Sequence, residues 1–125
     1  MDITPAVPEG RLTVQAYGGG GFRIAGKDHA GSVLLFPQLM RPWPVTRLDQ
    51  LMAHHFAPVI AAAPPVEVLL LGCGTVREPL PAALSDLLDG ADIGVDVMAT
   101  GPACRTFNVL VGEDRRVAAA LIAIG

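Results

Sequence analysis

The chain has 125 residues, 51% of them hydrophobic, and a formal net charge of −3. This length suffices for one hydrophobic core and is short for two, and the hydrophobic content excludes a disordered chain. The basic residues are scattered among a larger number of acidic ones, whereas nucleic-acid binding needs a clustered basic surface. We therefore expect one domain and no nucleic-acid partner.

The apolar segments are too short to span a membrane. The longest of them is interrupted by Pro58, Pro64 and Pro65 and falls well below the roughly 20 residues that a membrane-spanning helix needs. The first residues lack the basic and apolar regions of a secretory signal, so we expect reduced cysteines in a cytoplasm. The excess of Ala, Gly and Arg over a single Lys, Lys27, is typical of a GC-rich bacterial genome. These features predict a cytoplasmic bacterial protein without a transmembrane segment.

The first third of the chain has the character of short strands. Residues 1–10 contain two prolines and no periodicity, which predicts a flexible N-terminal arm before a domain over 11–125. Alternating or apolar patterns predict strands at residues 12–17, 22–25 and 32–36. The four glycines between the first two strands favour a hairpin or a bulge. Residues 27–29 have the polar character of an exposed turn, and the prolines within 40–47 favour an extended segment.

The segment from Leu48 to Ala63 has helical spacing with uncertain ends. Phe56, Val59 and Ile60 share one face of a helix over about 53–63, in which Pro58 is tolerated only near the first turn. In an alternative interpretation the helix runs over 48–57 and stops at the proline.

The remainder alternates between strands and helices. The apolar runs predict strands at 66–71, 93–98 and 117–124, with helices at 81–90 and 101–111 between them. Thr100 has the side chain of an N-cap residue for the second of these helices. A β-α-β-α-β order is typical of an α/β fold, and the uninterrupted apolar strand at 66–71 indicates burial on both faces.

Candidate functional residues follow two of these strands. Open α/β sheets bind ligands at the carboxyl ends of strands. We therefore expect a binding site among Gly72, Cys73, Gly74, Thr75, Thr100, Gly101, Cys104, Arg105 and Asn108. A helix start at Thr100 with Arg105 nearby would suit an anion. Cys104 in the first turn would be activated as a thiolate, or would pack as a small apolar residue.

Other patterns exclude cofactor chemistry. The turn at Gly72-Cys73-Gly74 lacks the third glycine of a dinucleotide fingerprint, and no P-loop lysine follows. His54 and His55 are adjacent and do not converge on one metal from a helix. We expect no cofactor and no metal.

Three segments of the chain, residues 17–37, 68–74 and 94–110, resemble the Mth-domain family, also catalogued as a domain of unknown function. The third segment is long and specific, and the resemblance covers about Leu12 to Ile124. It implies a compact α/β domain in which helices flank a central mixed β-sheet beside an additional β-layer. It also implies a last strand antiparallel to its neighbours. The family more often has Thr than Cys in the Gly-x-Gly turn, so Cys73 departs from its pattern.

The resemblance also carries an expectation about function. The family includes the third assembly factor of mitochondrial NADH:ubiquinone oxidoreductase and the adipogenesis-associated Mth-domain protein, while most bacterial members have no established activity. Because no complete catalytic constellation is present, the leading hypothesis is a non-enzymatic binding or assembly module for a respiratory complex, with a protein partner at the membrane. The alternative is an anion-binding or small-molecule-binding protein, or a thiol enzyme, that uses Cys73 and Cys104-Arg105. In a third interpretation the motif serves folding alone.

Overall fold

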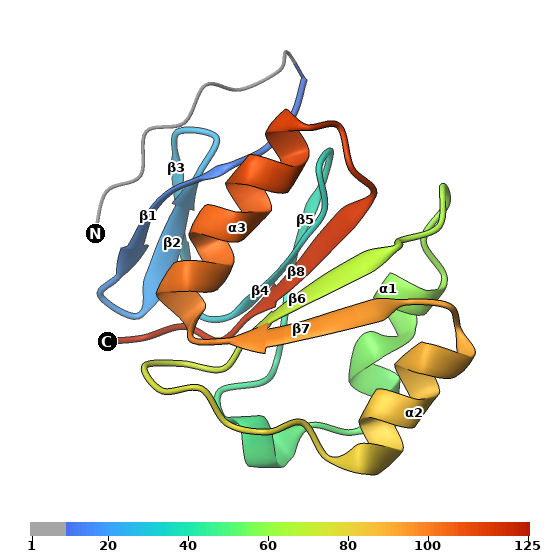
Figure 1. The fold of residues 1–125 in the computed structure, drawn as a ribbon. Coiled ribbons are helices and arrows are strands. Elements are labelled where there is room, and N and C mark those ends of the chain that lie inside the picture. The colour runs from blue at the N-terminus through green and yellow to red at the C-terminus, as the bar shows by residue number, and fades with distance from the viewer. Residues whose placement is uncertain (1–9) are drawn as a thin grey trace.

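A computed structural model describes residues 10–125 and contains two β-sheets and three α-helices (Figure 1). The smaller sheet is antiparallel and consists of β1 (Val14–Gly18), β2 (Gly21–Ile24) and β3 (Lys27–Ala30) in that order. The larger sheet has the order β5 (Met40–Pro42), β4 (Val33–Leu35), β8 (Val117–Leu121), β6 (Val68–Gly72) and β7 (Gly94–Met98). The predicted arm at 1–10 lies, except for Gly10, outside the described residues.

Helices lie on both faces of the larger sheet. The helical elements are η1 (Leu48–Gln50), η2 (Ala53–Phe56), α1 (Ala57–Ile60), α2 (Ala82–Gly90) and α3 (Thr100–Gly112). α3 and the smaller sheet cover one face, and α1 and α2 lie at the other (Figure 1). The predicted mixed sheet with flanking helices and an additional β-layer is therefore confirmed.

The central strand β6 separates two hydrophobic cores. Leu69 and Leu71 pack in the core beneath Trp43 and Phe56, whereas Leu70 packs in the core beneath α3. Each of these three leucines is almost completely buried, which contributes roughly 1.5–3 kcal/mol per side chain. Burial on both faces explains why the segment is apolar without alternation.

The direction of the last strand differs from the expectation. β8 is antiparallel to β4 but parallel to β6, so the predicted antiparallel arrangement is right on one side and wrong on the other. The cause is α3, which carries the chain back along the sheet after β7. Such a crossover returns the next strand in the same direction as the strand before it. β7 and β8 thereby flank β6 in parallel.

Two local predictions are corrected. Residues 27–29, expected as an exposed turn, belong to β3 and pair with β2. The turn lies instead at Ala25 and Gly26, both with positive φ. The side chains of Lys27 and Asp28 are exposed, but backbone pairing with a neighbouring strand does not require apolar side chains.

The helical segment at 48–63 is broken into short pieces, so neither predicted helix is present at its full length. η1 and η2 are single 3-10 turns, and α1 contains only four residues with Pro58 near its start. A proline lacks the N–H of an intrahelical hydrogen bond and fits only the first turn of a helix. Phe56 and Val59 are buried as predicted, whereas Ile60 is 40% exposed.

Candidate functional site

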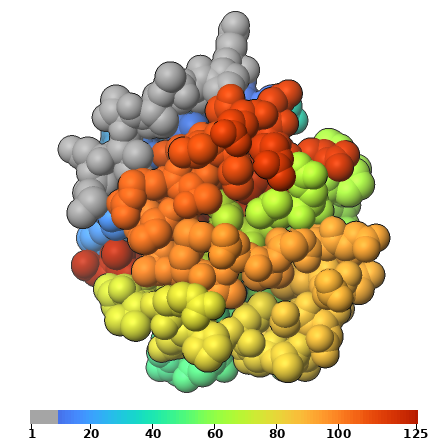
Figure 2. Space-filling model, viewed as in Figure 1, coloured from blue at the N-terminus to red at the C-terminus, as the bar shows by residue number. Residues whose placement is uncertain are grey.

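The turn after β6 and the start of α3 lie side by side at the carboxyl end of the parallel strands. The Gly74 N–H donates to Thr100 Oγ1 at 2.9 Å, and the Thr100 N–H donates to the Gly74 carbonyl at 2.8 Å. In the space-filling view the loop after β6 (yellow) lies on the surface beside the first turn of α3 (orange; Figure 2). The structure thus brings together the two segments from which a site was expected.

Thr100 joins the turn after β6 to the start of α3, a contact that we call the Thr100 junction. The Thr100 hydroxyl donates to the Ile122 carbonyl at 2.7 Å while accepting the Gly74 N–H, and the residue is fully buried. The N-cap position of α3 belongs to Ala99, so the prediction that Thr100 caps its own helix is wrong. The threonine side chain instead ties α3 to the ends of β6 and β8.

The first turn of α3 is covered by the smaller sheet. A Cβ added at Gly101 would lie 2.5 Å from the Tyr17 hydroxyl, so the tyrosine packs directly on this glycine. Arg105 donates from Nη1 to the same hydroxyl at 3.3 Å. Thr100 and Gly101 are buried, whereas Pro102 in the same turn is exposed.

The surroundings of Cys104 disfavour a thiolate. This cysteine lies in the second turn of α3 and is fully buried in the core beneath β1 and β2. Burial raises the pKa of the Cys104 thiol to about 12, and the nearby Arg105 charge opposes this only in part. Of the two interpretations of Cys104, burial favours the small apolar residue over the thiolate, because loss of hydration outweighs the nearby positive charge.

We expect Cys104 to resist alkylation in the folded protein. In a Cys73→Ala variant, which leaves one thiol, iodoacetamide labelling at pH 8 should be slow in buffer and fast in urea. The nucleophile is the thiolate, and burial disfavours both its formation and access to it. Rapid labelling of the folded variant at pH 8, at the rate of the unfolded chain, would contradict the assignment. A Cys104→Ala variant, which keeps only the Cys73 thiol, is labelled in the same way so that the labelling rates of the two cysteines can be compared.

Cys73 belongs to the opposite core. The two cysteines are free and lie in different hydrophobic clusters on either side of the sheet. Cys73 Sγ accepts the Glu78 N–H at 3.2 Å and lies 3.1 Å from the Met98 carbonyl oxygen. Its thiol thus shapes the loop after β6.

Asn108 also has a structural partner. Its amide nitrogen donates to the Val14 carbonyl at 2.9 Å, and its amide oxygen accepts the Val14 N–H at 2.9 Å. The side chain is buried and pairs with β1 where the register of β1 against β2 is irregular. Asn108 therefore joins α3 to the smaller sheet.

The predicted residues do not share one cavity. A shallow hollow of about 350 Å³ is bounded by residues 46–49, 73–75, Glu78 and 122–125. It includes Cys73, Gly74 and Thr75 but none of the predicted residues on α3. Thr75 and Arg105 are exposed, and a binding role for them stays a prediction.

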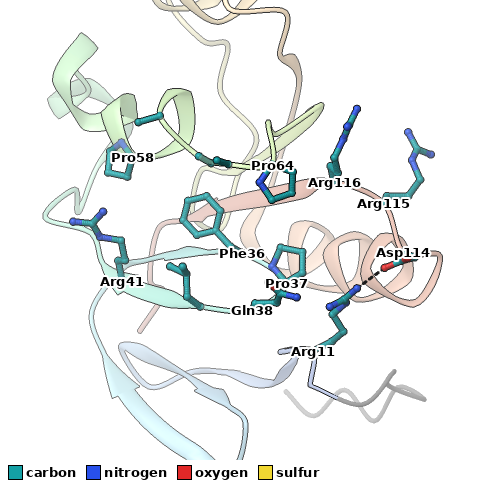
Figure 3. Close-up of a pocket in the computed structure, with 14 residues that line it drawn as sticks. Arg11, Phe36, Pro37, Gln38, Arg41, Pro58, Pro64, Asp114, Arg115 and Arg116 are labelled. Carbon is teal, nitrogen blue, oxygen red and sulfur yellow. Dashed lines mark hydrogen bonds and ion pairs between the residues drawn. The ribbon is translucent and has the colours of Figure 1, made fainter.

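A larger groove of about 540 Å³ lies at the other end of the sheet, where β6 and β8 begin (Figure 3). We call it the arginine groove. Its lining consists of Arg11, Phe36, Pro37, Gln38, Leu39, Arg41, Pro58, Ala61, Ala62, Ala63, Pro64, Asp114, Arg115 and Arg116.

The floor of the arginine groove is apolar. Phe36 and Pro64 lie at its centre (Figure 3), and the peptide bond before Pro64 is cis. Leu39 lies in the loop that joins β4 to β5 and is 50% exposed. The segment after α1 contributes alanines and prolines, whose small side chains leave the floor open.

Charged residues stand at both ends of the groove. Arg41 lies near Pro58 on one side of Phe36, and Arg11, Arg115 and Arg116 lie on the other (Figure 3). No ion pair or hydrogen bond of the Arg41 side chain is present within residues 10–125.

The arginines at the other end are partly neutralised. Arg11 pairs with Asp114 at 2.6 Å, as the dashed line in Figure 3 marks. Glu67, beside the groove, receives Arg115 Nε at 3.1 Å and lies 3.8 Å from Arg116 Nη2. The hydrogen bond from Arg115, followed by that from the Arg116 backbone, lowers the pKa of Glu67.

Sequence reasoning missed this groove. Arg115 and Arg116 are exposed, and scattered basic residues of this kind do not by themselves indicate a binding site. The sequence does contain one indication of the groove. The two arginines come directly before the buried apolar strand at 117–121, and this position places both side chains at the rim of the sheet. Within residues 10–125 no helix has the length and apolar character needed to cross a membrane. In the same range no three His, Cys, Asp or Glu side chains are grouped as metal ligands.

The fold defines an α/β domain of the kind described as Mth938-like. The solution structure of such a domain from Bordetella pertussis superimposes with a TM-score of 0.83 at 26% identity, covering all of this chain and 94% of that one. A crystal structure from Bartonella henselae, described as an outer membrane protein, matches with a TM-score of 0.86 at 40% identity and covers 93% and 98% of the two chains. The chain belongs to the family described as protein of unknown function (DUF498/DUF598), which matches residues 14–122.

Two curated relatives add information about function. An uncharacterised Rhodobacter capsulatus protein is 39% identical over 90% of this chain and 86% of its own length. The NADH dehydrogenase [ubiquinone] 1 alpha subcomplex assembly factor 3 of Danio rerio is 34% identical over 87% of this chain. The alignment covers 63% of that assembly factor. The family relation thus extends from uncharacterised bacterial proteins to assembly factors.

Proposed function

We propose that the protein is a non-enzymatic binding module that assists assembly of a respiratory membrane complex by holding a protein partner. The observation that carries the proposal is the arginine groove, an open concavity of about 540 Å³ with an apolar floor and charged ends. Its support from outside the chain is the relation to assembly factors named for NADH dehydrogenase.

The composition of the groove fits contact with a protein. Arginine is enriched at protein interfaces, and apolar surface surrounded by polar groups is typical of binding patches. The groove combines four arginines with Phe36 and Leu39. In this proposal the protein acts on the cytoplasmic side of a bacterial membrane, where it meets a subunit before the complex is complete.

A thiol enzyme is the less favoured function. It would need a reactive cysteine, and the pKa of Cys104 is raised by burial.

We expect deletion of the gene in its own bacterium to reduce the amount of fully assembled NADH:quinone oxidoreductase. The measurement is native gel electrophoresis of membranes with an in-gel NADH oxidation stain, calibrated against another respiratory complex. A plasmid copy of the wild-type gene should restore the level, as should an Arg47→Gln copy, because this exposed arginine lies outside the groove. An unchanged level of assembled enzyme in the deletion strain would contradict the proposal.

A further inference from the structure

We infer that the arginine groove binds a short acidic-apolar segment of a partner protein, with carboxylates at both ends and a large apolar side chain between them. The inference rests on the proposed function and adds the chemistry of the partner. The arrangement of charge, the free hydrogen-bond donors and the shape of the floor favour such a segment.

The groove carries positive charge in a chain that is negative as a whole. Four arginines line it, against Asp114 in the lining and Glu67 beside it, which leaves an excess of two positive charges. The formal net charge of the chain is −3. An acidic ligand is therefore attracted to this groove and repelled by much of the remaining surface, which favours one docking position.

The guanidinium groups retain donors for a carboxylate. Glu67 receives the Nε of Arg115, so the Nη groups of this arginine remain outside that hydrogen bond. At the other end of the groove, the Arg41 side chain donates no hydrogen bond to any of the described residues. A planar guanidinium binds a carboxylate through two parallel hydrogen bonds, which a lysine cannot reproduce.

The apolar floor separates the two charged ends. A single inorganic anion could neutralise one end, but it would leave Leu39, which is 50% exposed, uncovered and most of the 540 Å³ unfilled. A membrane surface is flat, whereas Arg41 and the other three arginines lie on opposite sides of Phe36 around a concavity (Figure 3). A peptide segment satisfies both requirements, because one residue fills the floor while its neighbours reach the two ends.

The test is selection of random twelve-residue peptides displayed on phage against the full-length protein. We expect selected peptides to share acidic residues on both sides of a large apolar residue. An Arg41→Gln/Arg116→Gln double variant serves as the counter-selection target. Both substituted side chains are exposed, so the fold should survive, and the urea midpoint of the variant verifies this.

The strongest selected peptide is then labelled and its affinity measured by fluorescence polarisation. We expect the double variant to weaken binding by at least about tenfold, because buried charged contacts are typical hot spots. Leu39→Ser should weaken it as well. The matched controls are Arg47→Gln, an exposed ion-paired arginine, and Val109→Ser, an apolar residue 58% exposed on α3. Both lie outside the groove and should leave the affinity unchanged.

Three results would overturn the inference. The first is selected peptides without acidic enrichment. The second is equal affinity for wild type and double variant. The third is binding of citrate, or of phosphatidylcholine vesicles containing phosphatidylglycerol, that depends on Arg41 and Arg116 while no peptide is selected. The proposed function is tested separately, because it fails if the deletion strain assembles the complex at the normal level. If deletion lowers that level but the double variant restores it, the assembly role stands without the groove as its docking site.

Discussion

Replacing Asn108 with leucine is expected to lower the free energy of unfolding by about 2–6 kcal/mol. The asparagine amide holds both the N–H and the carbonyl of Val14, each at 2.9 Å, in a buried position. Leucine has a similar size but cannot form hydrogen bonds, so two buried backbone groups lose their partners. Each such loss costs roughly 1–3 kcal/mol. The measurement is urea denaturation followed by circular dichroism.

Two further measurements separate this cause from a general packing defect. Thr106→Val removes a hydroxyl from the same helix, where it donates to the Pro102 carbonyl, and should change stability by only about 0.5 kcal/mol. Hydrogen exchange at the Val14 amide should be slow in the wild type and much faster in the Asn108→Leu variant. A variant as stable as the wild type would show that β1 does not depend on this amide.

The second large effect is expected at Thr100. Thr100→Val keeps the shape of the side chain but removes the hydroxyl that accepts from Gly74 and donates to Ile122. With two buried backbone groups left without partners, the free energy of unfolding should fall by about 2–6 kcal/mol. Thr100→Ser, which retains the hydroxyl, should lie much closer to the wild type in the same urea titration. Equal stability of the valine and serine variants would contradict the assignment.

The strands and helices of the second half could be predicted because their signals are local. The apolar run at β6, the alternation in β7 and the spacing in α3 each reflect burial against neighbouring layers. β3 was missed because its side chains are polar and its backbone pairing with β2 is independent of them. The direction of β8 relative to β6 depends on the path of α3, which no pattern within β8 itself reports.

The site was harder to predict because its character depends on distant residues. The parallel strands predict that Gly74 and Thr100 lie close together. The burial of this region, however, depends on Tyr17, which packs on Gly101, and on the Ile122 carbonyl, which accepts the Thr100 hydroxyl. The sequence left an activated and a buried Cys104 both open, and the choice depends on β1 and β2, far away in the sequence, which help to bury the thiol and so raise its pKa.

The arginine groove illustrates the same limit. Its lining comes from several segments that meet only after folding, including the loop after β4, the residues after α1 and those before β8. Each segment alone has the composition of an ordinary surface loop. A single sequence contains the individual charges and prolines but not their convergence.

The location of the Thr100 junction has a consequence for engineering this scaffold. The junction lies where β6 ends, and the groove lies where β6 begins, so the length of the strand separates them. Substitutions at distant, independent sites usually have additive effects. Substitutions at the rim of the groove are therefore expected to have little effect on thermal tolerance, and substitutions at the junction are expected to leave the shape of the groove unchanged.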